Sequence, residues 1–91
     1  MLRPKNVFVE QWQKYRANLH ASLGLIHLQS GQYPQSQAAY LKAIRLSRRD
    51  LVLYFRAGLA YSYDQKYEEV VDLLSRSVFL KESAANLPKW N

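Results

Sequence analysis

The sequence predicts an all-α protein that folds as a single domain of about four helices. Only three glycines and three prolines interrupt its 91 residues. Between them, apolar residues recur at intervals of three and four, which is the period of a helix rather than of a strand. A chain of this length holds one hydrophobic core. With 48% hydrophobic and 22% charged residues, its composition is that of a globular domain rather than a disordered segment.

The longest uninterrupted segment predicts a first helix over residues 7–30, with Asn6 as a candidate N-cap. Its large apolar residues lie on one face because they follow one another at steps of four and three. They are Phe8, Trp12, Tyr15, Leu19, Leu23 and Ile26. Gly31 suits the left-handed residue after a helix end. Pro34 suits the first turn of a second helix, which extends to about Ser47.

The second half of the chain predicts two more helices. Asp50 is placed to cap a third helix over residues 51–63, because its carboxylate can accept from the first free backbone amides. Residues 64–66 form a turn, and a fourth helix follows over about 67–81. Two carboxylates in its first turn interact favourably with the helix dipole. Residues 83–91 are expected to be irregular.

The chain also resembles itself at an offset of 34 residues. The identical pairs are Leu19/Leu53, Gly24/Gly58, Leu25/Leu59, Tyr33/Tyr67 and Leu46/Leu80. This period, with glycine and aromatic residues in these places, resembles the tetratricopeptide repeat, a helix-turn-helix unit. The resemblance implies antiparallel helical hairpins stacked as a short solenoid. Residues 1–16 then extend the first helix, 17–50 and 51–84 are the two repeats, and 85–91 form a tail.

The family pattern is matched in both units. In the first it is carried by Leu23, Gly24, Tyr33, Tyr40 and Ala43, and in the second by Tyr54, Ala57, Gly58, Tyr61, Tyr67 and Leu74. His20 and His27 stand where large aromatics are usual in the family, and Arg48 and Glu82 stand where each unit usually ends in proline. We expect both Gly24 and Gly58 to mark points where two helices approach too closely for a Cβ atom.

In tetratricopeptide proteins, the first helix of each unit lines a concave groove that receives a segment of a partner protein. With the residues placed by helical phase, the resemblance implies two sets of groove-wall residues. They are Asn18, Ala21, Ser22, Leu25 and Gln29 in the first unit, and Phe55, Arg56, Leu59, Ser62 and Tyr63 in the second. Arg56 is nearly alone among apolar groups, so the wall suits an amphipathic helix or apolar segment better than a C-terminal carboxylate. The resemblance thus implies a non-enzymatic protein-binding module without a cofactor: an adaptor, assembly factor or chaperone-like protein.

A self-associating structural subunit is an alternative, because two repeats are fewer than the three or more that usually stack into a stable core. The N-terminal extension, with Phe8, Trp12 and Tyr15, either caps its own chain or forms a homodimer. The last helix would leave apolar residues exposed unless the tail at residues 87–90 folds back or another chain covers them; they include Val71, Leu74, Val78 or Phe79. Residues 1–49 carry eight basic side chains and one acidic, a sum of +7, whereas residues 50–91 carry five and six, a sum of −1. This asymmetry favours a head-to-tail or swapped arrangement over one that faces two basic halves.

A less favoured function is RNA binding through a basic stripe on the second helix. The stripe consists of Lys42, Arg45 and Arg49, and Arg48 lies adjacent to it. The motifs and aromatic platforms of dedicated RNA-binding modules are absent, so a solvated helix face explains these residues more simply.

Nothing in the sequence indicates an enzyme or a metal site. His20 and His27 lie seven residues apart, about 10 Å along a helix, which is too far to share one zinc without other ligands. The acidic residues from Asp64 to Asp72 fit a solvated helix face, and the absence of cysteine excludes a disulfide scaffold. No apolar run reaches the roughly 20 residues that cross a bilayer, and no secretory signal is evident, so a cytoplasmic location is expected.

Overall fold

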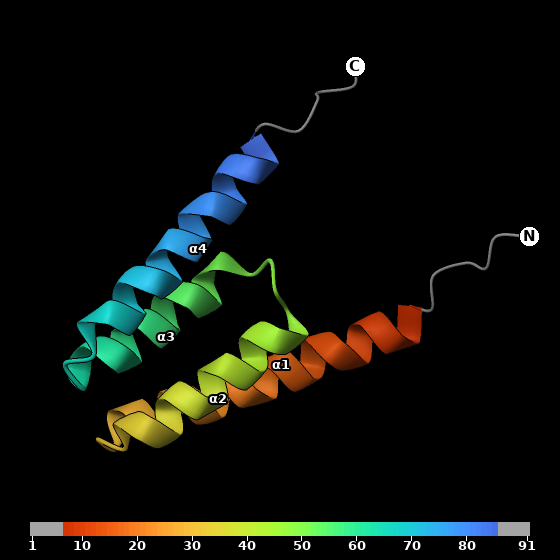
Figure 1. Ribbon diagram of the computed structural model, residues 1–91. Coiled ribbons are helices and arrows are strands. Elements are labelled where there is room, and N and C mark those ends of the chain that lie inside the picture. Colours follow the sequence, from red (N-terminus) through yellow and green to blue (C-terminus); the bar gives the residue numbers. More distant parts are fainter. Residues whose placement is uncertain (1–6, 86–91) are drawn as a thin grey trace, which may run out of the picture.

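The computed structural model describes residues 7–85, which form two antiparallel helical hairpins (Figure 1). The helices are α1 (Val7–Gln29), α2 (Tyr33–Leu46), α3 (Leu51–Tyr63) and α4 (Tyr67–Ala85). Each helix packs against the next one along the chain, and none of the described residues forms a strand. The prediction of an all-α fold is therefore confirmed. Residues 83–85, expected to be irregular, instead belong to α4, while Asn6 and residues 86–91 lie outside the described part.

The helix ends depend on the residues that the sequence singled out. Gly31 has a φ of +75° between α1 and α2, a conformation that costs glycine little because it lacks a Cβ atom. The side chain of Asp50 caps α3 by accepting a hydrogen bond from the amide of Val52 at 3.1 Å. The turn before α4 contains Gln65 with a φ of 59°, which the sequence did not predict.

The first hairpin closes on a seam of small residues. Ala17, Ala21 and Gly24 lie on the side of α1 that faces α2, and all three are buried. A Cβ atom added at Gly24 would come within 3.0 Å of three ring carbons of Tyr40. The hydroxyl of Ser36 also donates to the carbonyl of Gly24 at 2.6 Å. The close approach predicted at Gly24 is thus confirmed.

The second hairpin is less tightly closed at the equivalent glycine. A Cβ atom at Gly58 would meet only the side chain of Leu74, at 3.9 Å, which is ordinary van der Waals contact. The close approach predicted at Gly58 is wrong, because a partly buried leucine lies opposite it in place of a fully buried ring. Burial in this hairpin depends on larger residues, chiefly Leu53, Tyr54 and Leu73.

A polar bridge around Gln37 fixes the joint between the hairpins. The side-chain amide of Gln37, buried in α2, donates to the carbonyl of Ala60 at 3.3 Å and to the carboxylate of Asp64 at 3.0 Å. Lys66 donates to the amide oxygen of Gln37 at 3.3 Å and forms an ion pair with Asp64 at 3.2 Å. We call these contacts the Gln37 bridge. They tie the middle of α2 to the turn of the other hairpin.

The large apolar face predicted for the first helix does not form the core. Trp12, Tyr15, Leu19, Leu23 and Ile26, which we call the α1 stripe, are all exposed, and so is Phe8. They lie on the side of α1 away from the small-residue seam, since the two sets are about half a turn apart in helical phase. The first turns of α1 also project past the end of α2 (Figure 1). The described residues therefore do not fold this extension back as a cap on their own core.

Candidate protein-interaction surfaces

An apolar row runs along the outer side of α3. Val52, Phe55, Leu59 and Tyr63, which we call the α3 stripe, follow at steps of three, four and four and so share one side of the helix. Their exposed fractions are 52%, 57%, 47% and 56%. About half of each side chain is in contact with water. The buried residues of α3 are instead Leu53, Tyr54, Ala57, Gly58 and Ala60. A contiguous exposed apolar row of this kind is typical of a surface that another molecule covers.

Contacts within the chain hold the end of this stripe in place. The ring of Tyr63 stacks on that of Tyr33 at the start of α2, with centroids 5.6 Å apart and 14° between the planes. The hydroxyl of Ser62 donates to the carbonyl of Leu59 at 2.8 Å, so this donor is already satisfied within α3. The stripe is thus a preformed surface with few free polar groups.

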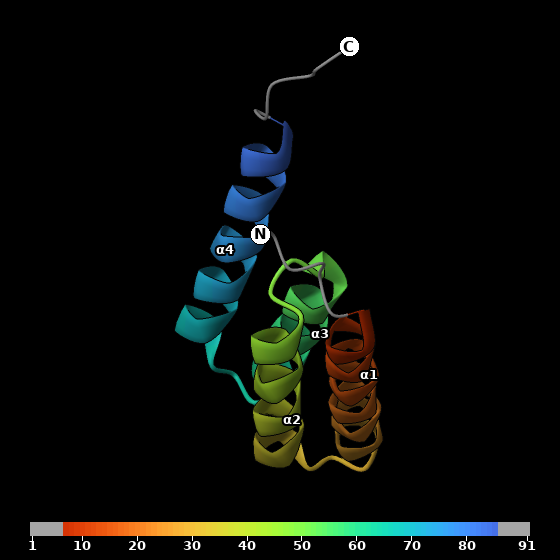
Figure 2. The ribbon, with the colours of Figure 1, turned by 90° about the vertical axis from the view of Figure 1, so that its right-hand side faces the viewer.

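The residues predicted for the groove wall on α1 lie together on one exposed row. They are Asn18, Ser22, Leu25 and Gln29. The prediction that Ala21 belongs to this wall is wrong. Ala21 is buried in the seam with α2, because it lies on the same side of α1 as Ala17 and Gly24. Figure 2 shows α1 to the right of α2, and α3 to the right of α4. No hydrogen bond, ion pair or ring contact among the described residues joins this row to the α3 stripe.

Arg56 is the cation beside the α3 stripe. Its side chain is exposed and forms no ion pair with any described residue. Its charge acts on Tyr40, whose hydroxyl is buried without a hydrogen-bond partner. Burial raises the pKa of Tyr40, and the positive charge of Arg56 opposes this in part. Tyr40 is accordingly a neutral core residue, and Arg56 remains available to an acidic group outside the chain.

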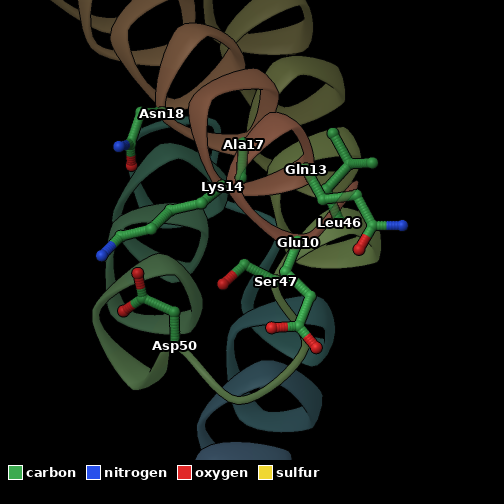
Figure 3. Close-up of a pocket in the computed structure, with 8 residues that line it drawn as sticks. All are labelled: Glu10, Gln13, Lys14, Ala17, Asn18, Leu46, Ser47 and Asp50. Atoms are coloured by element: carbon green, nitrogen blue, oxygen red, sulfur yellow. The ribbon is translucent and has the colours of Figure 1, made fainter. Parts of the chain in front are cut away.

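A polar pocket of about 190 Å³ lies where α1 passes the end of α2 (Figure 3). It is lined by Glu10, Gln13, Lys14, Ala17, Asn18, Leu46, Ser47 and Asp50. The sequence analysis missed this pocket because its residues come from two segments, 10–18 and 46–50, that are far apart in the sequence and share no motif. Acidic and basic side chains are mixed around it, and no group of three metal-ligating residues occurs within residues 7–85.

The two histidines lie on α1 and are partly buried. Nδ1 of His27 hydrogen-bonds to the side-chain oxygen of Gln32 at 2.7 Å, across the end of the helix. Gln32 in turn donates its backbone amide to the carbonyl of His27 at 2.8 Å. His27 thus stabilises the turn between α1 and α2.

The three residues of the predicted basic stripe, Lys42, Arg45 and Arg49, and the adjacent Arg48 are all exposed. Only Lys42 and Arg45 lie on a helix, because α2 ends at Leu46 and the other two residues belong to the turn before α3. Arg45, however, lines a groove between α2 and α4 together with Glu69 and Asp72. Asp72 also pairs with Arg76 at 2.9 Å. Carboxylates beside the basic stripe weaken its attraction for the phosphate groups of RNA. The basic stripe is therefore a poorer candidate for an interaction surface than the α3 stripe.

Comparison with known proteins adds no relative: no protein family, curated protein or solved structure matches the chain. Within the described residues, no helix has the length and apolar character that crossing a membrane requires.

Proposed function

We propose that the protein is a non-enzymatic interaction module of the tetratricopeptide type, which binds an apolar segment of a partner protein along the α3 stripe. The observation that supports this proposal is the continuous row of four half-exposed apolar side chains on one helix. An adaptor or assembly role follows, because such a surface recognises a segment and has no reactive group of its own.

The size of the stripe limits what can bind. From residue 52 to residue 63 it extends about 16 Å at 1.5 Å per residue, or three helical turns. An amphipathic helix of similar length, with apolar residues at intervals of three and four, would cover it. Completing the burial of each side chain contributes roughly 1 kcal/mol, about half of what full burial of a large apolar residue contributes. Because the stripe is preformed, little of this energy is lost in ordering it.

The charge beside the stripe adds a second requirement. Arg56 is exposed, and no described residue forms an ion pair with it. A partner with a carboxylate flanking its apolar row would place that group close to the guanidinium, which favours correct docking more than it raises affinity. We therefore propose an amphipathic partner segment whose apolar face is bordered by an acidic residue.

A photo-crosslinking residue at position 59 tests the proposal, with one at the exposed position 49 as a control. The partner segment crosslinked at 59, and not at 49, is then synthesised and its affinity is measured. Phe55→Ala and Leu59→Ala should each weaken binding about tenfold, as expected for large residues at the centre of an interface. Arg49→Ala should have no effect, and circular dichroism should show unchanged helicity in all three. Intact binding by Phe55→Ala and Leu59→Ala would refute the proposal.

The role of Arg56 is tested separately with the same peptide. Arg56→Glu should weaken binding and reverse its dependence on salt, whereas Arg56→Lys should bind nearly as well as the unchanged protein. Equal affinities for the two variants would show that no carboxylate of the partner lies near this position.

A further inference from the structure

The first and last helices of the described residues, α1 and α4, each leave an apolar surface exposed. One is the α1 stripe. The other is an open groove of about 450 Å³ on α4, which we call the α4 groove. It is lined by Val71, Leu74, Ser75, Val78, Phe79 and Glu82. Neither surface belongs to the α3 stripe, so the proposed function leaves both unexplained.

The 34-residue offset relates the α1 stripe to residues that are buried in α3. The equivalent pairs are Leu19 with Leu53, Leu23 with Ala57, and Ile26 with Ala60. The α1 members are 58%, 39% and 56% exposed, whereas the α3 members are 4%, 0% and 0% exposed. Ala60 marks the side of α3 that meets α2, because its carbonyl accepts the hydrogen bond from Gln37. The α1 stripe thus corresponds to the side of α3 that α2 covers.

The same offset relates the α4 groove to the side of α2 that takes part in this joint. The equivalent pairs are Gln37 with Val71, Ile44 with Val78, and Tyr40 with Leu74, of which the last two residues also face the glycine of their own hairpin. All three α2 residues are buried, whereas Val71 and Val78 are exposed and Leu74 is only partly buried. The two ends of the helix stack therefore present the two halves of an interface that the chain already forms between its own hairpins.

We propose that copies of this protein associate head to tail, with the α4 groove of one copy packed on the α1 stripe of the next in the way that α2 packs on α3. The contact is heterologous, so an assembly of any length keeps one free α1 stripe and one free α4 groove, and the array can grow beyond a dimer. The partner at both surfaces is a second copy of the same chain.

The charges of the two helices agree with this pairing. α4 carries four acidic and two basic side chains, whereas α1 carries two basic and one acidic. A contact between α1 and α4 brings opposite net charges together, while pairing α1 with α1 or α4 with α4 brings like charges together. Complementary charge selects partners and suppresses the symmetric alternatives.

Two variants test the proposal, each with a carboxylate in one half of the interface. Ile26→Glu damages the α1 stripe, and Val78→Glu damages the α4 groove; both positions are exposed, so circular dichroism should show unchanged helicity. Sedimentation equilibrium over about a hundredfold range of concentration should give an average mass above the dimer for the unchanged protein. Each variant alone should associate at least about tenfold more weakly, because a charge opposes burial in an apolar contact.

Mixing the two variants decides between head-to-tail and symmetric pairing. Each variant retains the half that the other has lost, so the mixture should form a one-to-one dimer and nothing larger. Leu59→Glu, an equally exposed apolar position on the α3 stripe, is the matched control and should associate like the unchanged protein even if it loses the partner segment. The proposal is overturned by an unchanged protein that is monomeric throughout, by Val78→Glu that still dimerises alone, or by a mixture that stays monomeric.

Discussion

The two hairpins contain the same glycine at the same offset and use it differently. In the first hairpin, the face of a fully buried tyrosine ring lies against Gly24 at a distance that leaves no room for a side chain. In the second, Gly58 faces a leucine across an ordinary contact distance. The comparison shows that a repeated residue identifies an equivalent place in the fold. The residue opposite determines whether that place tolerates a side chain.

The largest expected effect on stability comes from truncating the residues opposite the two glycines, Tyr40 and Leu74. Tyr40→Ala should lower the free energy of unfolding by about 3 to 5 kcal/mol, because it leaves a cavity at a fully buried position. Leu74→Ala should cost only about 1 to 2 kcal/mol, since Leu74 is partly exposed. Urea unfolding of both variants measures the difference. Equal losses would mean that the two hairpins are packed alike.

Adding a methyl group at each glycine should change stability in opposite directions. Gly24→Ala places a Cβ atom against the Tyr40 ring and should destabilise by about 1 to 3 kcal/mol. Gly58→Ala meets no such obstacle and should stabilise by roughly 0.5 to 1 kcal/mol, the gain that alanine gives over glycine inside a helix. Thermal unfolding of the two variants provides the test, and a shift of the same sign in both would contradict it.

The hydroxyl of Tyr40 provides a test within the first hairpin alone. It is buried and has no hydrogen-bond partner, so Tyr40→Phe should stabilise the protein by about 1 kcal/mol while retaining the ring that packs on Gly24. Chemical unfolding measures this change. A loss of stability instead would reveal that the hydroxyl is hydrogen-bonded in solution.

The smallest effect should come from acid titration at the turn of the second hairpin. Hydrogen bonds from Gln37 and Lys66 lower the pKa of Asp64. A lowered pKa means that the folded state favours the carboxylate, so its contribution to stability is present above the unfolded value of about 4. That contribution is lost as the pH falls through the folded pKa. The difference in Tm between the unchanged protein and Asp64→Asn should therefore be present at about pH 7 and shrink at about pH 2.

Local signals in the sequence were sufficient to predict the helices. Gly31 and Asp50 terminate and begin helices through their own backbone and side-chain chemistry, so their effect does not depend on distant residues. The end of α4 was predicted too early, because helix continuation past Lys81 has no such marker. Three residues of the α3 stripe, Phe55, Leu59 and Tyr63, were predicted by helical phase as part of a groove wall, whereas Val52 was not.

The sequence could not show which side of α1 packs against α2. Both the large apolar stripe and the row of Ala17, Ala21 and Gly24 have helical spacing, and apolar size alone favours the stripe. Packing favours the small row instead, since it allows the close approach of Tyr40. That preference depends on a residue in another helix. A pattern within one helix therefore cannot reveal it.

The Gln37 bridge distinguishes the joint between the two hairpins of one chain from the joint proposed between two copies. At the equivalent place in α4 stands Val71, whose side chain can neither donate nor accept a hydrogen bond, so the joint proposed between copies has no counterpart of the Gln37 side-chain contacts. Apolar contact without directional bonds constrains rotation and sliding less than a hydrogen-bonded joint does. Dilution would thus separate the copies while each keeps its hairpins in register, and the average length of the array would follow the amount of protein that the cell makes.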